Sequence, residues 1–217
     1  MSILSLENIS FSYGSNQVLN NISYEFDAGK VYCIVGKSGA GKTTLLSLLS
    51  GLAKPTGGRI LYDGKNIAGI DKYAFRSKYI GVIFQSFNLL TKYTAVENVV
   101  LSMDIAGYKC KYKKEKAMSL LASVGLDTDE SQRRVLKLSG GQQQRVAIAR
   151  ALSYDPDIIL ADEPTGNLDS ETQQEIMDIF HKLASEGKCV ILVSHSPEVA
   201  AQCDERYELV KLTKNKR

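Results

Sequence analysis

The stretch Gly36-Lys37-Ser38-Gly39-Ala40-Gly41-Lys42-Thr43 matches the pattern G-x-x-x-x-G-K-[ST] and decides how the chain around it is arranged. Glycines at these positions let backbone N–H groups wrap a chain of phosphates. An apolar strand is predicted directly before it, over Lys30–Val35, and a helix directly after it, over Thr43–Ser50. The N-terminus of that helix would add a positive dipole beside the phosphates. A chance match is expected well below about one time in a hundred, so the stretch predicts a nucleotide-binding loop.

The polar residues of this loop have separate predicted roles. Lys42 would reach the β- and γ-phosphates, and the Thr43 hydroxyl would bind Mg²⁺. The backbone around them would hold the rest of the phosphate chain. The predicted ATP contacts in the loop are Gly36, Lys37, Ser38, Gly39, Ala40, Gly41, Lys42, Thr43 and Thr44. ATP and Mg²⁺ are therefore the expected cofactors.

Outward from the loop, short strands and helices alternate along most of the chain. The predicted strands are Leu4–Ser12, Ile22–Phe26, Lys30–Val35, Arg59–Tyr62, Tyr79–Phe84, Asp157–Ala161 and Lys188–Val193. The predicted helices after the middle of the chain are Ser170–Ser185 and Pro197–Gln202. Between the strands Tyr79–Phe84 and Asp157–Ala161, three helical segments follow one another without a strand: Ala95–Ala106, Lys113–Val124 and Gly140–Leu152. This order predicts a parallel α/β core with a helical insertion.

The composition narrows the function classes. The chain has 217 residues, a formal net charge of +3 and 44% hydrophobic residues, which is ordinary for a globular protein. This charge argues against nucleic acid as a partner, because such a binder would be expected to show a stronger basic stripe. No apolar run approaches the roughly 20 residues that cross a bilayer, and no signal peptide is expected. The scattered cysteines, Cys33, Cys110, Cys189 and Cys203, favour a reducing cytosol over a disulfide framework or metal site.

Two acidic residues, Asp162 and Glu163, follow the apolar strand Asp157–Ala161. Ligands collect at the carboxyl ends of parallel strands, so Asp162 is expected near Mg²⁺. Glu163 lies one residue further along, where it could orient and polarise a water molecule. The alternative for these residues alone is a strand that ends in solvated acids. Together with the phosphate loop, they form the expected metal-binding strand.

A second helix start is found at Leu138-Ser139-Gly140-Gly141-Gln142. Ser139 is a good N-cap, and the glycines leave the first helix amides open. This makes a second anion site that does not belong to the phosphate loop. The alternative is an ordinary capped helix, because many helices begin with Ser-Gly.

With Leu138–Gln142 in place, the chain resembles the nucleotide-binding domain of ABC transporters over essentially all 217 residues. The resemblance implies an α/β fold of the P-loop NTPase (RecA-like) type: a parallel-sheet core with an N-terminal antiparallel β region and an inserted α-helical subdomain. It implies a single ABC ATPase domain over 1–217. The ATP-binding core is expected at 1–85 and 154–217, and the helical signature subdomain at 86–153.

Other positions match motifs of this family one by one. Tyr13 resembles the aromatic residue that stacks on adenine, although a hairpin-tip tyrosine is the alternative. Gln85 resembles the glutamine that contacts Mg²⁺ or water and links the two lobes. The segment Asn167-Leu168-Asp169 resembles a dimer-facing loop, and His195 resembles the histidine that touches the γ-phosphate. No catalytic position departs from the family pattern, so the resemblance implies an active ATPase.

These matches imply a complete set of site residues. The implied catalytic residues are Glu163 as general base, His195, Lys42 and Gln85. The implied metal ligands are Thr43, Gln85 and Asp162. The implied ATP contacts outside the phosphate loop are Tyr13, Ser139, Gly140, Gly141, Gln142 and Asp169.

The resemblance also implies partners. In this family, the Ser139–Gln142 segment of one subunit closes over ATP held by the phosphate loop of a second copy. The expected assembly is an ATP-sandwich dimer bound to an integral membrane permease subunit, with no nucleic acid. The chain would then lie in the cytoplasm, peripherally on the inner face of the cell membrane.

Two longer motifs suggest a branch of the family. Phe84–Leu90 and Glu163–Asp169 resemble the branch of lipoprotein-release, macrolide-export and antimicrobial-peptide ATPases. This implies export or extraction of a peptide, lipoprotein or hydrophobic compound. A cell-division type ATPase that transmits force without transport is the alternative. A soluble DNA-repair type ATPase is less favoured, because Ser86–Leu136 is too short for the long coiled coils of that class.

Two further function classes fit the sequence less well. A ribosome-acting regulator built from two such domains would need two phosphate loops, whereas this sequence has a single one. A scaffold that holds ATP without hydrolysing it would not need Glu163 and His195. The segment Tyr108–Lys116 carries five lysines and two tyrosines, and it is either a solvated helix start or attracted to an anionic membrane or acidic partner. The basic tail Lys211–Arg217 is expected to fray.

Overall fold

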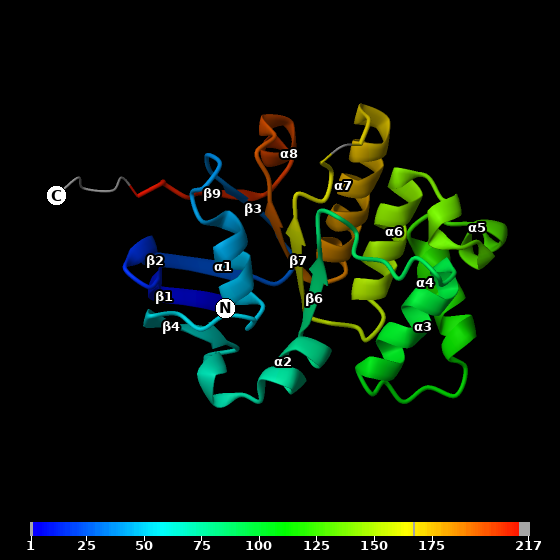
Figure 1. Cartoon of the computed structure of the whole chain (residues 1–217), viewed down its shortest axis with the longest axis horizontal. Coiled ribbons are helices and arrows are strands. Elements are labelled where there is room, and N and C mark those ends of the chain that lie inside the picture. The colour runs from blue at the N-terminus through cyan, green and yellow to red at the C-terminus, as the bar shows by residue number, and fades with distance from the viewer. Residues whose placement is uncertain (1, 167, 213–217) are drawn as a thin grey trace.

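The computed structural model describes residues 2–166 and 168–212 and divides them into two lobes (Figure 1). One lobe holds two β-sheets and the helices beside them, and the other is made of helices alone. Asn167, in the predicted dimer-facing loop, and residues 213–217 of the basic tail lie outside the described residues. Among the described residues, no helix has the length and apolar character needed to cross a membrane.

A parallel sheet forms the centre of the larger lobe. Its strands lie in the order β6 (Ile80–Ile83), β7 (Ile158–Asp162), β8 (Cys189–Val193), β3 (Val31–Val35) and β9 (Glu205–Glu208). Every neighbouring pair is parallel, so all five carboxyl ends lie on the same edge. Strands β3, β7 and β8 are nearly uniformly apolar because both faces of the sheet are covered.

A second, antiparallel sheet precedes it. It has the order β2 (Asn16–Asp27), β1 (Ser2–Tyr13), β4 (Gly57–Tyr62) and β5 (Lys65–Asn66). The predicted strand Ile22–Phe26 was too short, because the polar residues Asn16 and Gln17 also pair with β1. The hairpin turn is confined to two residues, and Gly14 adopts φ 57° there, where a side chain would add strain.

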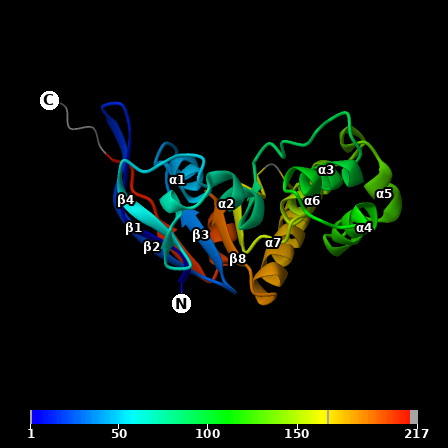
Figure 2. The same cartoon turned by 90° about the horizontal axis from the view of Figure 1, so that it is seen from below.

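Helices cover the parallel sheet and build the second lobe (Figure 2). Beside the sheets lie α1 (Lys42–Leu49), α2 (Lys72–Lys78), α7 (Ser170–Ser185) and α8 (Pro197–Ala201). The second lobe contains α3 (Ala95–Ile105), α4 (Lys113–Ser123), α5 (Thr128–Gln132) and α6 (Gly140–Ala151). Single turns of 3₁₀ helix occur at Ile67–Gly69 and Val135–Lys137. The predicted parallel core, antiparallel region and helical insertion are confirmed.

Two apolar cores lie on opposite faces of the parallel sheet. Within β7, Ile159 packs into one core and Leu160 into the other, as the two-residue period of a strand requires. The first core continues through α7, by way of Phe180, into the helical lobe at Val146 and Leu121. The two lobes therefore share one core, and the residue boundaries between them stay a prediction.

Two helices and two strands were missed from the sequence, α2, α5, β5 and β9, together with the two 3₁₀ turns. Each is seven residues long or shorter, so hydrophobic periodicity gives little indication of it. Helix α2 begins at Asp71, whose side chain accepts a hydrogen bond from the N–H of Ala74 at 2.7 Å. Strand β9 is held by its pairing with β3, at a distance of more than 160 residues along the chain. A pairing that distant leaves no local pattern in the sequence.

Candidate functional site

The carboxyl ends of four parallel strands meet around one cavity of about 1030 Å³. The loop 36–41 follows β3, Gln85 follows β6, Asp162 and Glu163 end β7, and His195 follows β8. Parallel strands that point the same way gather the residues that follow them at one edge. Four segments, scattered over more than 150 residues, therefore line a single space.

Thirteen of the predicted site residues line this cavity. They are Tyr13, Gly36, Lys37, Ser38, Gly39, Gly41, Lys42, Thr43, Thr44, Gln85, Asp162, Glu163 and His195. Ala40 does not reach it, because its side chain is buried beneath the loop, against the position that a Gly36 Cβ would take. Ser139, Gly140, Gly141, Gln142 and Asp169 lie elsewhere.

The phosphate loop leaves the start of α1 free of side-chain caps. Gly41 is the N-cap of α1 with φ 97°, and no side chain bonds the first amides of that helix. A Cβ on Gly41 would lie 2.9 Å from Val18 and Leu19, so this position needs glycine for space as well as for conformation. The Lys42 ammonium donates to the Gly36 carbonyl at 2.8 Å and keeps two further donors. The free amides and this ammonium suit a phosphate chain.

The paired carboxylate Asp162 lies against the start of α1. The Thr43 hydroxyl donates to Asp162 Oδ2 at 3.2 Å. Partial burial raises the pKa of Asp162 above its ordinary value, and the negative charge of Glu163 adds to the rise. The Thr43 hydrogen bond and the charge of Lys42 act in the opposite direction. A carboxylate that is costly to ionise here fits a bound cation.

The donor set at this point fits Mg²⁺. Mg²⁺ takes oxygen ligands, keeps several waters and is often held by one or two protein groups together with substrate phosphates. Asp162, Thr43 and the Gln85 amide supply oxygens that all face the cavity. Among the described residues, no group of three or more His, Cys, Asp or Glu is arranged for a metal ion. The fit therefore depends on few protein oxygens and on phosphate.

Glu163 is held in a backbone conformation that is uncommon for its residue type. Its φ is 47°, in the left-handed region where a bulky residue is strained. Its Oε1 lies 2.8 Å from Nδ1 of His195, and its Oε2 accepts from the His195 N–H at 3.4 Å. The Glu163 side chain is 13% exposed, whereas the His195 side chain is 73% exposed. The carboxylate is thus fixed at the wall of the cavity, and the imidazole projects into it.

Tyr13 is an aromatic residue in the lining of the cavity. It ends β1 at the hairpin turn, and its side chain is 60% exposed. The Phe11 ring supports it edge-to-face, with centroids 4.8 Å apart. An exposed, supported aromatic ring in the cavity lining is suited to stacking on a base.

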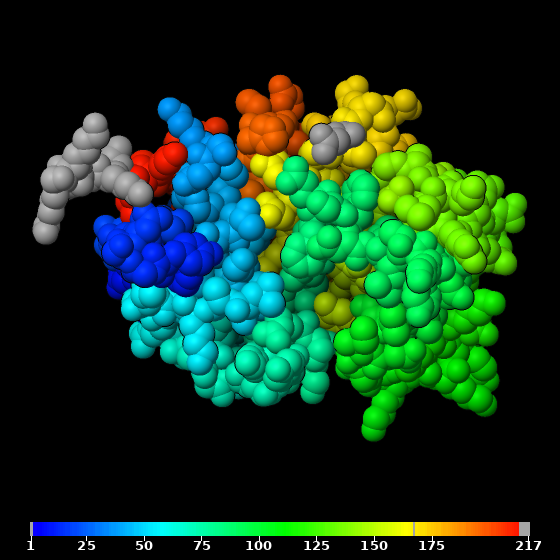
Figure 3. Space-filling view, in the orientation of Figure 1, coloured from blue at the N-terminus to red at the C-terminus, as the bar shows by residue number. Residues whose placement is uncertain are grey.

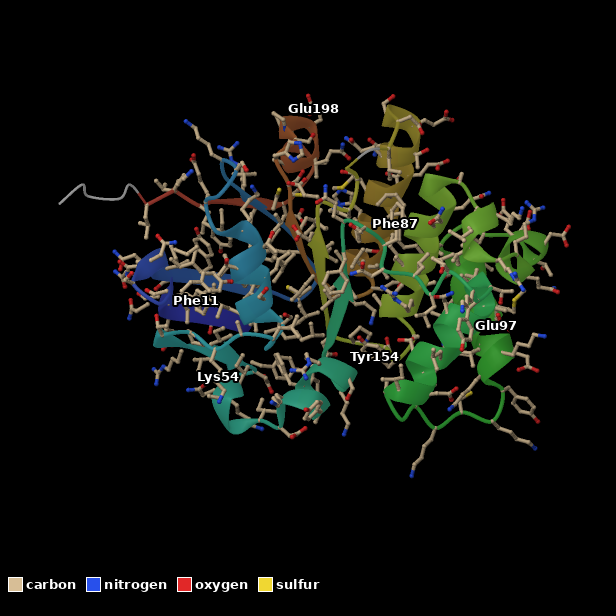
Figure 4. The ribbon with its side chains drawn as sticks, viewed as in Figure 1. Phe11, Lys54, Phe87, Glu97, Tyr154 and Glu198 are labelled. Atoms are coloured by element: carbon tan, nitrogen blue, oxygen red, sulfur yellow. The ribbon has the colours of Figure 1, made fainter. Side chains whose placement is uncertain are left out.

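Gln85 begins a loop that joins the two lobes, and Arg150 of α6 grips that loop. Phe87 and Asn88 have φ values of 58° and 50°, and their carbonyls accept hydrogen bonds from Arg150 at 3.0 Å and 2.5 Å. Burial lowers the pKa of the Arg150 guanidinium. Phe87 and Tyr154 mark this junction in Figure 4. The contact ties the end of α6 to the loop that starts with Gln85.

The start of α6 carries a capping box rather than an uncapped loop. The Ser139 hydroxyl accepts from the Gln142 N–H at 3.2 Å, and Gln142 Oε1 accepts from the Ser139 N–H at 2.8 Å. Asp169 caps α7 in a similar way through the Thr172 N–H at 2.9 Å. Neither cap touches the cavity within one chain.

A groove of about 470 Å³ separates α2 from the helical lobe, and it is visible as a hollow in Figure 3. Its rim carries Tyr73 and Ile105, which are 66% and 78% exposed. Arg76 lies over the Tyr73 ring at 5.2 Å. Arg150 and Tyr154 line the groove as well. The residues that grip the Gln85 loop are therefore continuous with an exposed, partly apolar surface.

Sequence reasoning missed four residues that line the cavity: Asn16, Val18, Val35 and Glu208. Asn16 and Val18 lie on β2, next to the turn that positions Tyr13. Glu208 ends β9, one of the strands that were missed. The Arg150 contact was missed too, because helix periodicity cannot show what lies 62 residues away. A correct assignment of β9 would have found Glu208.

Known proteins of one family are similar to this chain over nearly its whole length. Residues 19–166 match the family model described as ABC transporter. The chain is 46% identical over 207 residues to the uncharacterized ABC transporter ATP-binding protein YclH of Bacillus subtilis, covering 94% of this chain and 92% of that protein. It is 41% identical to the lipoprotein-releasing system ATP-binding protein LolD of Bacteroides thetaiotaomicron, covering 96% and 97%.

A solved structure is similar in fold as well as in sequence. It is a dimeric post-hydrolysis state of the ATP-binding cassette MJ0796, bound to ADP and Pi. Its TM-score is 0.87 and its identity is 35%, with 97% of each chain covered. This identity supports more than the fold alone.

Proposed function

Because the chain belongs to the ABC transporter ATP-binding family, and is therefore an ATPase, we propose that two copies close head to tail around two ATP molecules and drive a separate membrane subunit. The observation that carries this proposal is the separation of the two anion-binding helix starts. The cavity contains the start of α1, whereas Ser139 at the start of α6 lies outside it. Both helices begin on the upper side in Figure 1, α1 in the lobe that holds the sheets and α6 in the helical lobe. A second copy turned by half a revolution would bring each start of α6 over the other copy's cavity.

Within one site, we assign binding and catalysis to different groups. The amides of 36–43 and Lys42 would stabilise negative charge on the transferring phosphoryl group. Mg²⁺, held by Thr43, Asp162 and Gln85, would neutralise part of the phosphate charge when bound. Tyr13 would stack on adenine. Ser139, Gly140 and Gly141 of the second copy would contact the γ-phosphate, and Asp169 would face the same interface.

Glu163 would act as the general base that orients the attacking water. Each of its carboxylate oxygens retains a lone pair beyond its contact with His195. An ionised carboxylate only accepts, so Nδ1 of His195 must carry the proton in this contact. If Nε2 also donates to the γ-phosphate, the ring has two N–H groups and a positive charge. Glu163 would therefore present a base to the attacking water, and His195 would present a positive charge to the γ-phosphate.

The membrane subunit would dock on the groove between α2 and α3. Its exposed Tyr73 and Ile105 favour an apolar side chain, and Arg76 favours an acidic one. A short amphipathic helix with acidic residues has this chemistry. Arg150 joins the groove to the Gln85 loop, so movement in the cavity would reach the partner. This partner would hold the chain on the cytoplasmic face of the membrane.

The transported compound is proposed from the branch. Similarity to LolD supports export or extraction of a lipoprotein, peptide or hydrophobic compound. The alternative is force transmission to a membrane partner without transport. Recovery of a membrane protein from solubilised membranes supports either reading, and recovery of ribosomes or DNA contradicts both.

Glu163→Gln tests the dimer. This variant keeps the side-chain volume and the contact to His195 but removes the base, so it should retain ATP, hydrolyse it at least about a hundredfold more slowly and accumulate as a dimer. Sedimentation with saturating MgATP measures the dimer, with MgADP as the control. A variant that stays monomeric with MgATP contradicts the proposal.

A further inference from the structure

The capping box at the start of α6 is bound by a carboxylate from a neighbouring helix. Gln142 Nε2 donates to Glu130 Oε1 at 2.5 Å. Glu130 belongs to α5, where its Oε2 accepts from the Asp127 N–H at 2.9 Å. Figure 1 shows α5 beside the beginning of α6. One half-buried carboxylate therefore joins the N-termini of two helices.

This contact sets the orientation of the Gln142 amide. Its oxygen accepts from the Ser139 N–H at 2.8 Å, which leaves its nitrogen to face Glu130. An acceptor opposite that nitrogen stabilises this orientation. The capping box and the Glu130 contact therefore support each other.

The same carboxylate places a negative charge beside a helix N-terminus. Such a charge stabilises the helix, because it interacts with the positive end of the dipole. The ion pairs found among the described residues do not include Glu130. An incoming phosphate would meet the same positive end and would be repelled by this carboxylate.

We propose that Glu130 is a positioning residue with two opposed effects: it orients Gln142 for the ATP interface, and its charge weakens the interface so that the dimer can reopen. The inference rests on the proposed dimer, in which the start of α6 meets the γ-phosphate of ATP on the second copy. Glu130 touches no residue that lines the cavity of its own chain. It acts on ATP in two ways, through the orientation of Gln142 and through its charge beside the start of α6.

Glu130→Gln separates the two effects. The new side chain keeps one acceptor oxygen for Gln142 Nε2, but it loses the charge and the second oxygen, which accepts from the Asp127 N–H. A single charge near a helix terminus changes an equilibrium by about two- to fivefold. A dimer contains two such sites, so its dissociation constant should fall by about four- to twentyfivefold. In the hydrolysing protein, KM for ATP should fall while kcat stays within about twofold.

Asp129→Asn is the matched control. Asp129 precedes Glu130 in the first turn of α5, is exposed, and makes no contact with Gln142. The Asp129→Asn variant loses one negative charge from the same helical turn, and its dimer dissociation constant should change less than about twofold. Glu130→Ala removes the acceptor as well as the charge, so its dimer should be weaker than that of Glu130→Gln.

All three variants are compared in the Glu163→Gln background, by sedimentation of the full chain across a range of MgATP concentrations. If the background itself does not dimerise, the proposed function fails. If it dimerises and Glu130→Gln gives the same dissociation constant as Asp129→Asn, the inference about Glu130 is overturned. A dimer of Glu130→Ala as tight as that of Glu130→Gln overturns the orienting effect.

Discussion

The molecule contains two helix N-termini that suit phosphate, and they are built in opposite ways. Helix α1 begins at Gly41 in a left-handed conformation, without any side-chain cap. Helix α6 begins at Ser139, where Ser139 and Gln142 cap each other. The first start leaves its amides for a ligand, whereas the second satisfies some of them internally. In the proposed dimer, each of these helix starts forms one half-site for ATP, and the start of α6 meets its ligand only after the dimer has formed.

The glycines at the two helix starts are required for different reasons. Gly39 and Gly41 have φ values of 77° and 97°, so the phosphate loop needs their backbone freedom. Gly140 and Gly141 have no such φ values, so the space around each position decides whether a side chain fits there. A Cβ on Gly141 would lie 2.5 Å from Cγ2 of Thr172, but one on Gly140 would make only ordinary contact with Leu168 at 3.7 Å. Conformation limits one half-site, and packing against α7 limits the other.

The largest expected effect on activity comes from a change at the start of α1, which has no side-chain cap. Lys42→Ala removes the ammonium beside the phosphates, and kcat/KM for ATP should fall at least about a hundredfold, as for loss of one strong electrostatic group. Phosphate release measures it. Lys54→Ala, a lysine that lines no part of the cavity, is the control and should retain full activity. Normal turnover by Lys42→Ala would remove the distinction between the two starts.

The next effect is expected at Gly141. Gly141→Ala should lower the free energy of unfolding by about 1–3 kcal/mol, because its Cβ collides with Thr172. Gly140→Ala, with ordinary contact, should cost less. Urea unfolding measures both.

The rescue variant isolates the cause of the Gly141 effect. Thr172→Ser removes Cγ2 but keeps the hydroxyl that donates to Asp169 at 2.8 Å. Combined with Gly141→Ala, it should recover most of the lost stability. Equal destabilisation by Gly140→Ala and Gly141→Ala would show that packing against α7 is not the limit.

The smallest effect separates capping from anion binding. Ser139→Ala and Thr94→Ala each remove the N-cap of a capping box, on α6 and α3. Each should lower the free energy of unfolding by about 1 kcal/mol. Since Thr94 lies at no anion site, ATP-driven dimerisation should weaken only in Ser139→Ala. Equal dimerisation by the two variants would make the start of α6 an ordinary capped helix.

The two half-sites also differed in how far they could be predicted. The phosphate loop, Asp162 and Glu163 follow buried strands directly, so local pattern and the rule for parallel sheets placed them at one edge. His195 and Gln85 needed the family resemblance, because a polar residue after a strand is common in any protein. Glu208 needed β9, whose pairing with β3 has no local signal. The roles of all these residues in catalysis stay predictions.

The alternation of strands and helices along the chain, the helical insertion and the phosphate loop depend on residues close together in the sequence, so local periodicity and turn chemistry predict most of them. Three contacts required the folded molecule: His195 against Glu163, Arg150 against the Gln85 loop, and Glu130 against Gln142. Each joins segments that only chain packing brings together. Hydrogen-bond partners depend on angles and on distances of a few ångströms, and no sequence pattern carries that information for residues that are not neighbours.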